Sequence, residues 1–169
     1  MCARTPRLLV SATLAIAVWA AHPWPVAAQA ADSSNEDRLL LGTWKLNLAK
    51  SKYRSGPPPQ SQTRIYEPQG QGVKATITTI HPDGRSTTVG YVANYDSLEY
   101  PVTGSSESDT IALKKIAPRT AEAVMSHAGR VMATARRIIS EDGQTLTIEY
   151  KGESQGQQVN YTAVYEKQK

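Results

Sequence analysis

The residues of this sequence that could do chemistry are tyrosines and arginines. Five tyrosines lie on segments in which apolar and polar residues alternate as in a β-strand, and they fall on the side expected to face inward. They are Tyr91, Tyr95, Tyr150, Tyr161 and Tyr165. A phenol offers an apolar ring and a polar tip, which suits the enclosure of an amphipathic molecule. The candidate ligand-binding tyrosines are Tyr91, Tyr95, Tyr150 and Tyr165. Because the chain has no Phe, the same tyrosines could instead be the aromatic filler of a packed core.

Two adjacent arginines, Arg136 and Arg137, lie in the segment 131–139. Alternation along a strand sends one of them inward and the other outward, and the sequence does not decide which. An inward arginine is costly unless it is paired. It either meets an anionic ligand or lies near a strand end, where its head reaches water. We take Arg136 as the candidate ligand-binding arginine.

The remaining polar residues do not indicate catalysis. His81 and His127 sit beside Pro-Asp-Gly and Ala-Gly turn signals, where histidines are usually solvated. Neither has metal-ligand spacing, and the sequence contains no nucleophile elbow or phosphate-binding glycine loop. We therefore expect no enzyme activity, no metal and no cofactor.

The first thirty residues have the order of a secretory signal. Arg4 and Arg7 precede an apolar run over 8–20, and Ala28-Gln29-Ala30 follows. Cleavage is predicted after Ala30, with cleavage after Ala28 as the alternative. The apolar run is shorter than the roughly 20 residues that span a bilayer, so no stable membrane anchor is expected. The sequence predicts a secreted or periplasmic protein.

The composition of the chain fits one domain. The 169 residues are 40% hydrophobic, and the single cysteine, Cys2, leaves with the signal. Removal of the signal leaves 17 basic and 15 acidic residues, a net charge of +2 instead of +4. Because these charges are interleaved, no nucleic-acid partner is expected. Residues 31–40 are predicted to be a polar leader, and 41–169 the folded domain.

Apolar residues recur at every second position through most of that domain. Examples are the sets Trp44, Leu46 and Leu48; Val73, Ala75 and Ile77; Tyr91, Ala93 and Tyr95; and Leu146, Ile148 and Tyr150. Turn signals separate these segments at 81–84, 128–129, 141–143 and 155–156, and the three prolines at 57–59 require a loop. The pattern predicts about ten antiparallel strands with little or no helix, in a barrel or a sandwich.

Three motifs carry a family resemblance. Gly42-Thr43-Trp44-Lys45 opens the first strand, Ser140-Glu141-Asp142-Gly143 precedes the penultimate strand, and Val164-Tyr165-Glu166-Lys167 closes the last strand. Together they resemble the calycins, which include lipocalins and fatty-acid-binding proteins. Residues 41–168 are similar to a family of secreted bacterial lipocalin-like proteins. The resemblance implies an all-β, up-and-down calycin-like barrel in which Trp44 packs structurally across the closed end.

The resemblance also has two departures. Tyr165 matches the tyrosine of the carboxylate clamp of fatty-acid-binding proteins, but Ala163 stands where that clamp has an arginine. The helical lid of those proteins is replaced by the short proline-containing segment 51–62. We expect a non-catalytic secreted protein that binds a small apolar or amphipathic molecule in the barrel interior. The alternative is a filled barrel that serves as a protein-interaction or envelope-structural module.

Overall fold

The alternating segments form β-strands in the computed structural model, which describes residues 38–154 and 156–169. The predicted signal segment and most of the predicted leader lie outside these residues. The strands are β1 (Gly42–Leu46), β2 (Lys52–Tyr53), β3 (Ser61–Gln69), β4 (Gly72–Ile80), β5 (Ser86–Ala93), β6 (Asp96–Thr103), β7 (Thr110–Ala117), β8 (Thr120–His127), β9 (Arg130–Ile139), β10 (Thr145–Ser154) and β11 (Gln157–Lys167). Helical structure in the described part is confined to a turn at 38–40 and the 3-10 helix η1 (Leu48–Lys50).

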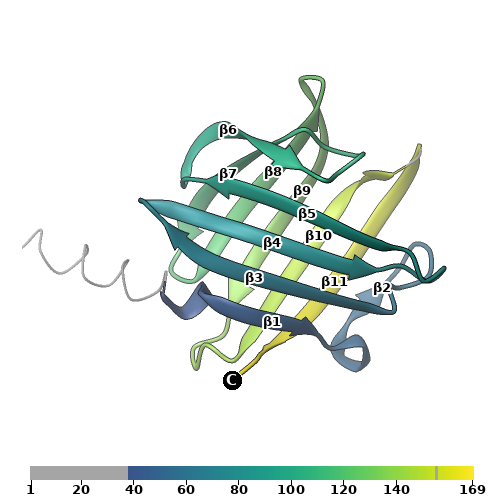
Figure 1. Ribbon diagram of the computed structural model, residues 1–169, viewed down its shortest axis with the longest axis horizontal. Helices are drawn as coiled ribbons and strands as arrows, with labels where there is room; N and C mark the ends of the chain where they lie inside the picture. Colours follow the sequence, from purple (N-terminus) through teal and green to yellow (C-terminus); the bar gives the residue numbers. More distant parts are fainter. Residues whose placement is uncertain (1–37, 155) are drawn as a thin grey trace, which may run out of the picture.

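The strands form one closed antiparallel barrel (Figure 1). From β3 to β11 each strand pairs with the next, and β1 pairs with β3 on one side and β11 on the other, so that ten strands complete the ring. After η1 the short β2 continues along β11. Closure leaves no long edge strand to aggregate. The prediction of an all-β up-and-down barrel of about ten strands is confirmed.

The local sequence signals explain where the strands turn. The 81–84 segment joins β4 to β5, where the Gly84 amide donates to the His81 carbonyl at 2.9 Å. The signals at 128–129 and 141–143 likewise separate β8 from β9 and β9 from β10, and the three prolines lie in the loop between β2 and β3. Because connections alternate between the two ends, the loops after β2, β4, β6, β8 and β10 gather at one end, which we call the mouth.

The opposite end is closed by a core around Trp44. This side chain is fully buried, and its Nε1 donates to the Leu40 carbonyl at 2.7 Å. The Lys167 Nζ caps the same end by donating to the Leu39 carbonyl at 2.8 Å, 5.2 Å from the centroid of the Trp44 ring. Leu40, assigned from the sequence to the leader, is thus part of the packed core. Trp44 thus lies within the buried core at this end of the barrel.

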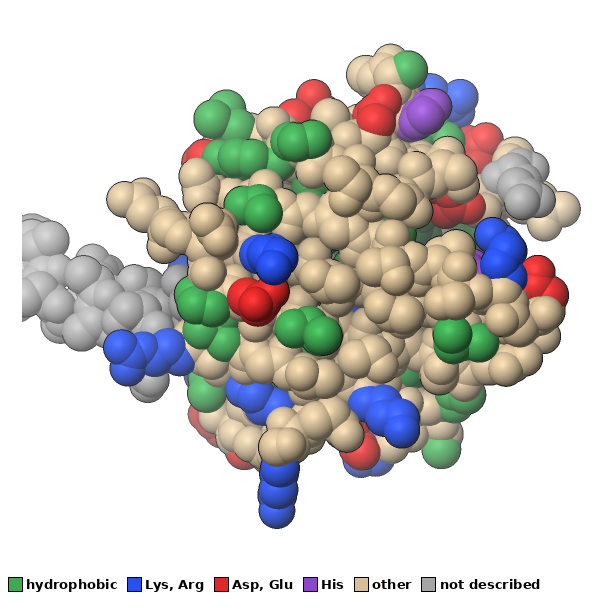
Figure 2. Space-filling model, in the orientation of Figure 1, with side chains coloured by type: hydrophobic (Ala, Val, Ile, Leu, Met, Phe, Trp, Pro, Cys, Tyr) green, Lys and Arg blue, Asp and Glu red, His purple; other side chains and the backbone are tan. Residues whose placement is uncertain are grey.

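One face of the outer surface carries dispersed charge (Figure 2). Figure 2 shows one face of the molecule, on which acidic and basic side chains are scattered among polar groups. In the described part of the chain, no helix is long and apolar enough to cross a membrane.

Candidate functional site

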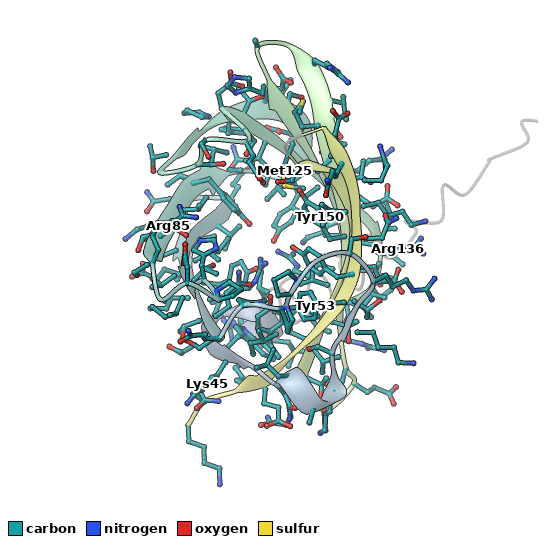
Figure 3. The ribbon with its side chains drawn as sticks, turned by 90° about the vertical axis from the view of Figure 1, so that its right-hand side faces the viewer. Lys45, Tyr53, Arg85, Met125, Arg136 and Tyr150 are labelled. Atoms are coloured by element: carbon teal, nitrogen blue, oxygen red, sulfur yellow. The ribbon has the colours of Figure 1, made fainter. Side chains whose placement is uncertain are left out.

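Two adjoining cavities extend from the mouth into the barrel. The outer part, the mouth cavity, has a volume of about 520 Å³, and the inner part, the deep cavity, about 110 Å³. The two parts adjoin each other, since they share the lining residues Ile77, Val89, Ser108, Met125, Tyr150 and Tyr161. Figure 3 looks into this opening, with Tyr53, Met125 and Tyr150 around it. The barrel is therefore hollow and accessible from one end.

Small residues on two neighbouring strands leave the space. Ala121 and Ala123 on β8 and Ala135 on β9 line the deep cavity, and Ala123 lies directly opposite Ala135 in the sheet. Aliphatic side chains such as Ile77, Ile111 and Ile148 form other parts of the wall. The methyl groups cannot fill the gap between the walls, so the interior stays open.

Arg64 points into the deep cavity from β3. Its Nε donates to the Gln62 Oε1 at 3.2 Å, and its Nη1 lies 3.5 Å from the Tyr66 hydroxyl. The guanidinium also stands over the Tyr165 ring, 5.0 Å from its centroid. Tyr165 in turn donates its hydroxyl to Gln62. Gln62 and Tyr165 thus orient Arg64 without neutralising its charge.

Arg137 points into the same cavity from β9. Its Nη2 donates to the Tyr95 hydroxyl at 2.6 Å, and its guanidinium carbon lies 5.3 Å from the Tyr95 centroid and 5.7 Å from the Tyr66 centroid. Its Nε is buried and has no hydrogen-bond partner. Tyr66 is therefore shared by the two arginines, and one guanidinium N–H is left unused.

Three stacked tyrosines line the passage toward the mouth. The rings of Tyr150 and Tyr161 are 4.7 Å apart with 5° between their planes, and those of Tyr53 and Tyr161 are 5.2 Å apart with 26° between theirs. Tyr150 and Tyr161 line both parts of the cavity, and Tyr53 lines the mouth cavity. The stack gives the passage a broad apolar wall with hydroxyl tips.

Burial keeps these phenols in their neutral form. It raises the pKa of Tyr150 to about 12, with a smaller contribution from the charge of Glu107. Burial also raises the pKa of Tyr53, Tyr91, Tyr161 and Tyr165. For Arg137, burial lowers the pKa but the surrounding tyrosine oxygens raise it by more, so that this guanidinium stays charged.

The tyrosines predict an alkaline limit to stability. A phenol whose folded-state pKa exceeds the unfolded value of about 10 contributes stability that is fully present below that value and is lost as the pH rises through the folded pKa. We expect cooperative unfolding to accompany ionisation above pH 10, measured together by circular dichroism and tyrosinate absorbance. Tyr150→Phe should make the loss of stability above pH 10 less steep, because one buried phenol no longer releases its proton on unfolding. Titration of every tyrosine near pH 10 in the folded barrel would contradict the burial described above.

The candidate residues from the sequence fall in three places. Tyr91 and Tyr150 line the cavity. Tyr95 and Tyr165 do not line it, but they hold Arg137 and Arg64. The choice of Arg136 was wrong, because this side chain is half exposed on the outer face, 3.9 Å from Glu122 (Figure 3). The inward arginine is Arg137.

Sequence reasoning missed Arg64 and Tyr66. On β3 the alternation is inverted, since Arg64 faces inward while Ile65 is 38% exposed, so a search for apolar faces passes over it. For Arg136 and Arg137, the register of β9 against β8 and β10 decides which side chain faces outward. Arg136 pairs in register with both Glu122 and Glu149, and opposite charges across strands favour an outward row.

The two histidines of the described chain lie near the mouth. The His81 Nε2 is 2.8 Å from the Thr87 Oγ1, and the His127 Nδ1 is 3.7 Å from the Asp109 Oδ2. Within 38–154 and 156–169, no group of three or more His, Cys, Asp or Glu residues could hold a metal ion.

Comparisons with known proteins found distant structural likenesses. No protein-family model matches the sequence, and no significant match appeared among curated proteins. The zebrafish ileal bile acid-binding protein complexed with cholic acid is 10% identical, with 77% of this chain and 99% of that chain covered and a TM-score of 0.47. The siderocalin Ex-FABP, described as having dual ligand specificities, is 9% identical, with coverages of 77% and 74% and a TM-score of 0.39. Likenesses this weak assign no ligand to this chain.

Proposed function

We propose that this protein is a non-catalytic binding protein that holds a small amphipathic molecule inside its barrel, in a secreted or periplasmic setting. The observation that carries the proposal is the pair of adjoining cavities, of which the outer lies at the mouth and the inner is lined by Arg64 and Arg137. Small-molecule sites are typically concave and mostly apolar, with a few polar groups that fix orientation. The aliphatic walls, the tyrosine stack and the two arginines meet that description.

The test fills the deep cavity with a larger side chain and compares the result with the same substitution on the outer surface. Ala135 lines the deep cavity, and the neighbouring Thr134 is exposed. We expect the unaltered protein to bind an environment-sensitive apolar dye at one site per chain, and long-chain amphiphiles to displace it. Ala135→Phe should lower dye affinity at least tenfold, because the ring occupies the deep cavity. Thr134→Phe should leave the affinity unchanged.

Circular dichroism and thermal unfolding must accompany these measurements, because an added ring can strain a packed barrel. Absence of dye binding in the unaltered, folded protein would reject interior binding and favour the filled-barrel alternative. Equal losses for Ala135→Phe and Thr134→Phe would mean that the dye binds elsewhere.

A further inference from the structure

The deep cavity holds two cations that no acidic side chain balances. Among the described residues, neither Arg64 nor Arg137 has a carboxylate within 4 Å, although surface arginines such as Arg130 and Arg136 do. Glu122 is the one acidic residue that lines the deep cavity, and its carboxylate lies 3.9 Å from Arg136 on the outer face. Burial of an uncompensated charge is unfavourable. The interior therefore lacks a counter-charge.

The side chains next to Arg64 and Arg137 do not supply a negative charge. The groups that face them are phenols: Tyr66, Tyr161 and Tyr165 around Arg64, and Tyr66, Tyr91 and Tyr95 around Arg137. A phenol ordinarily ionises near pH 10. The buried Nε of Arg137, which has no partner, is an unused donor of the kind that a bound anion accepts from.

The balance of charge differs between the two ends of the cavity. Glu107 lies at the mouth, where it accepts a hydrogen bond from Ser154, while the basic Arg85 at the mouth lies beside Asp83 at 3.6 Å. The uncompensated positive charge is thus at the deep end and the apolar tyrosine stack is nearer the mouth. An amphipathic anion is stabilised when its head lies deep and its tail follows the stack.

We propose that the interior ligand is an amphipathic molecule whose head group carries two negative charges, bound between Arg64 and Arg137. The number of charges follows from two buried guanidiniums without an acidic partner. Phosphate monoesters and dicarboxylates share this chemistry. The proposal deepens the interior-binding function and rests on it.

The test compares probes that share a twelve-carbon tail and differ in head-group charge. The probes are dodecyl phosphate, dodecylmalonate, dodecyl sulfate and dodecanol, each used below its micelle concentration in dye displacement. At pH 8 we expect at least one of the two dianions to bind at least tenfold more tightly than the sulfate, and dodecanol to bind most weakly. A preference between dodecyl phosphate and dodecylmalonate identifies the head group.

Dodecyl phosphate also provides an internal switch of charge. Its second ionisation lies near pH 6, as in other phosphate monoesters. Its affinity should rise at least tenfold from pH 5 to pH 8, whereas that of dodecyl sulfate, a monoanion throughout, should stay constant. Parallel behaviour of the two probes would refute a site for two charges.

Variants separate the charge from the cavity. Arg64→Met and Arg137→Met should each weaken the preferred dianion at least tenfold while leaving dodecanol unchanged, and Arg136→Met should change neither. If sulfate binds as tightly as both dianions at pH 8, or if only one arginine matters, the proposal is overturned although the interior-binding function stands. If even dodecanol and the dye fail to bind the folded protein, both fail.

Discussion

Replacing Trp44 with alanine is expected to lower the free energy of unfolding by about 3–5 kcal/mol, the usual cost of removing a large buried aromatic. Trp44 is fully buried within the core that closes the barrel, together with Leu40, Leu146 and Tyr165. Its removal would leave a cavity at the junction of β1, β11 and the segment before β1. Chemical denaturation followed by circular dichroism measures the loss.

Two further variants separate the contribution of the Trp44 hydrogen bond from that of its buried ring and provide a surface control. Trp44→Phe keeps a ring but leaves the Leu40 carbonyl without the donor now 2.7 Å away, so we expect a loss of about 1–3 kcal/mol. Val131→Ala, at a side chain that is 57% exposed on β9, should stay within about 0.5 kcal/mol of the parent. A loss for Trp44→Ala as small as that for Val131→Ala would show that the closed end is not a core.

Replacing Arg137 with methionine is expected to raise the stability of the ligand-free protein by about 1–4 kcal/mol, which is the range for buried ion pairs replaced by apolar residues of similar volume. The cation over Tyr66 and Tyr95 and its bond to the Tyr95 hydroxyl offset part of the burial cost. The unused Nε and the missing carboxylate leave the rest uncompensated. The methionine side chain occupies the space of the aliphatic part of the arginine and carries no charge.

Arg136→Met is the matched control, because that side chain is half exposed and should change stability by no more than about 0.5 kcal/mol. Thermal and denaturant unfolding of the ligand-free protein measure both variants. Stabilisation by Arg137→Met together with weaker anion binding would mean that the arginine is kept for its ligand at a cost in stability. Destabilisation by several kcal/mol would instead make Arg137 a structural residue held by its tyrosines.

The sequence by itself determined the strands and the turns between them. Val73, Ala75 and Ile77 alternate as predicted, and the predicted turns at 81–84 and 141–143 connect the strands observed. These features depend on local chemistry, since period-two alternation and residues that accept turn conformations act over a few positions. The same local signals also indicate antiparallel pairing of neighbouring strands, because the connections between them are short.

Only the tertiary structure decided which polar side chains enter the barrel. Arg136 and Arg137 are equivalent to a local pattern, and their facing depends on the register of β9 against β8 and β10. A shift of one residue in that register would exchange them. Arg64 escaped notice because inward polar residues leave no apolar alternation, and its setting comes from Gln62, Tyr66 and Tyr165, the last of which lies on β11. The barrel brings these residues together through closure of β1 between β3 and β11, a long-range contact that no short segment specifies.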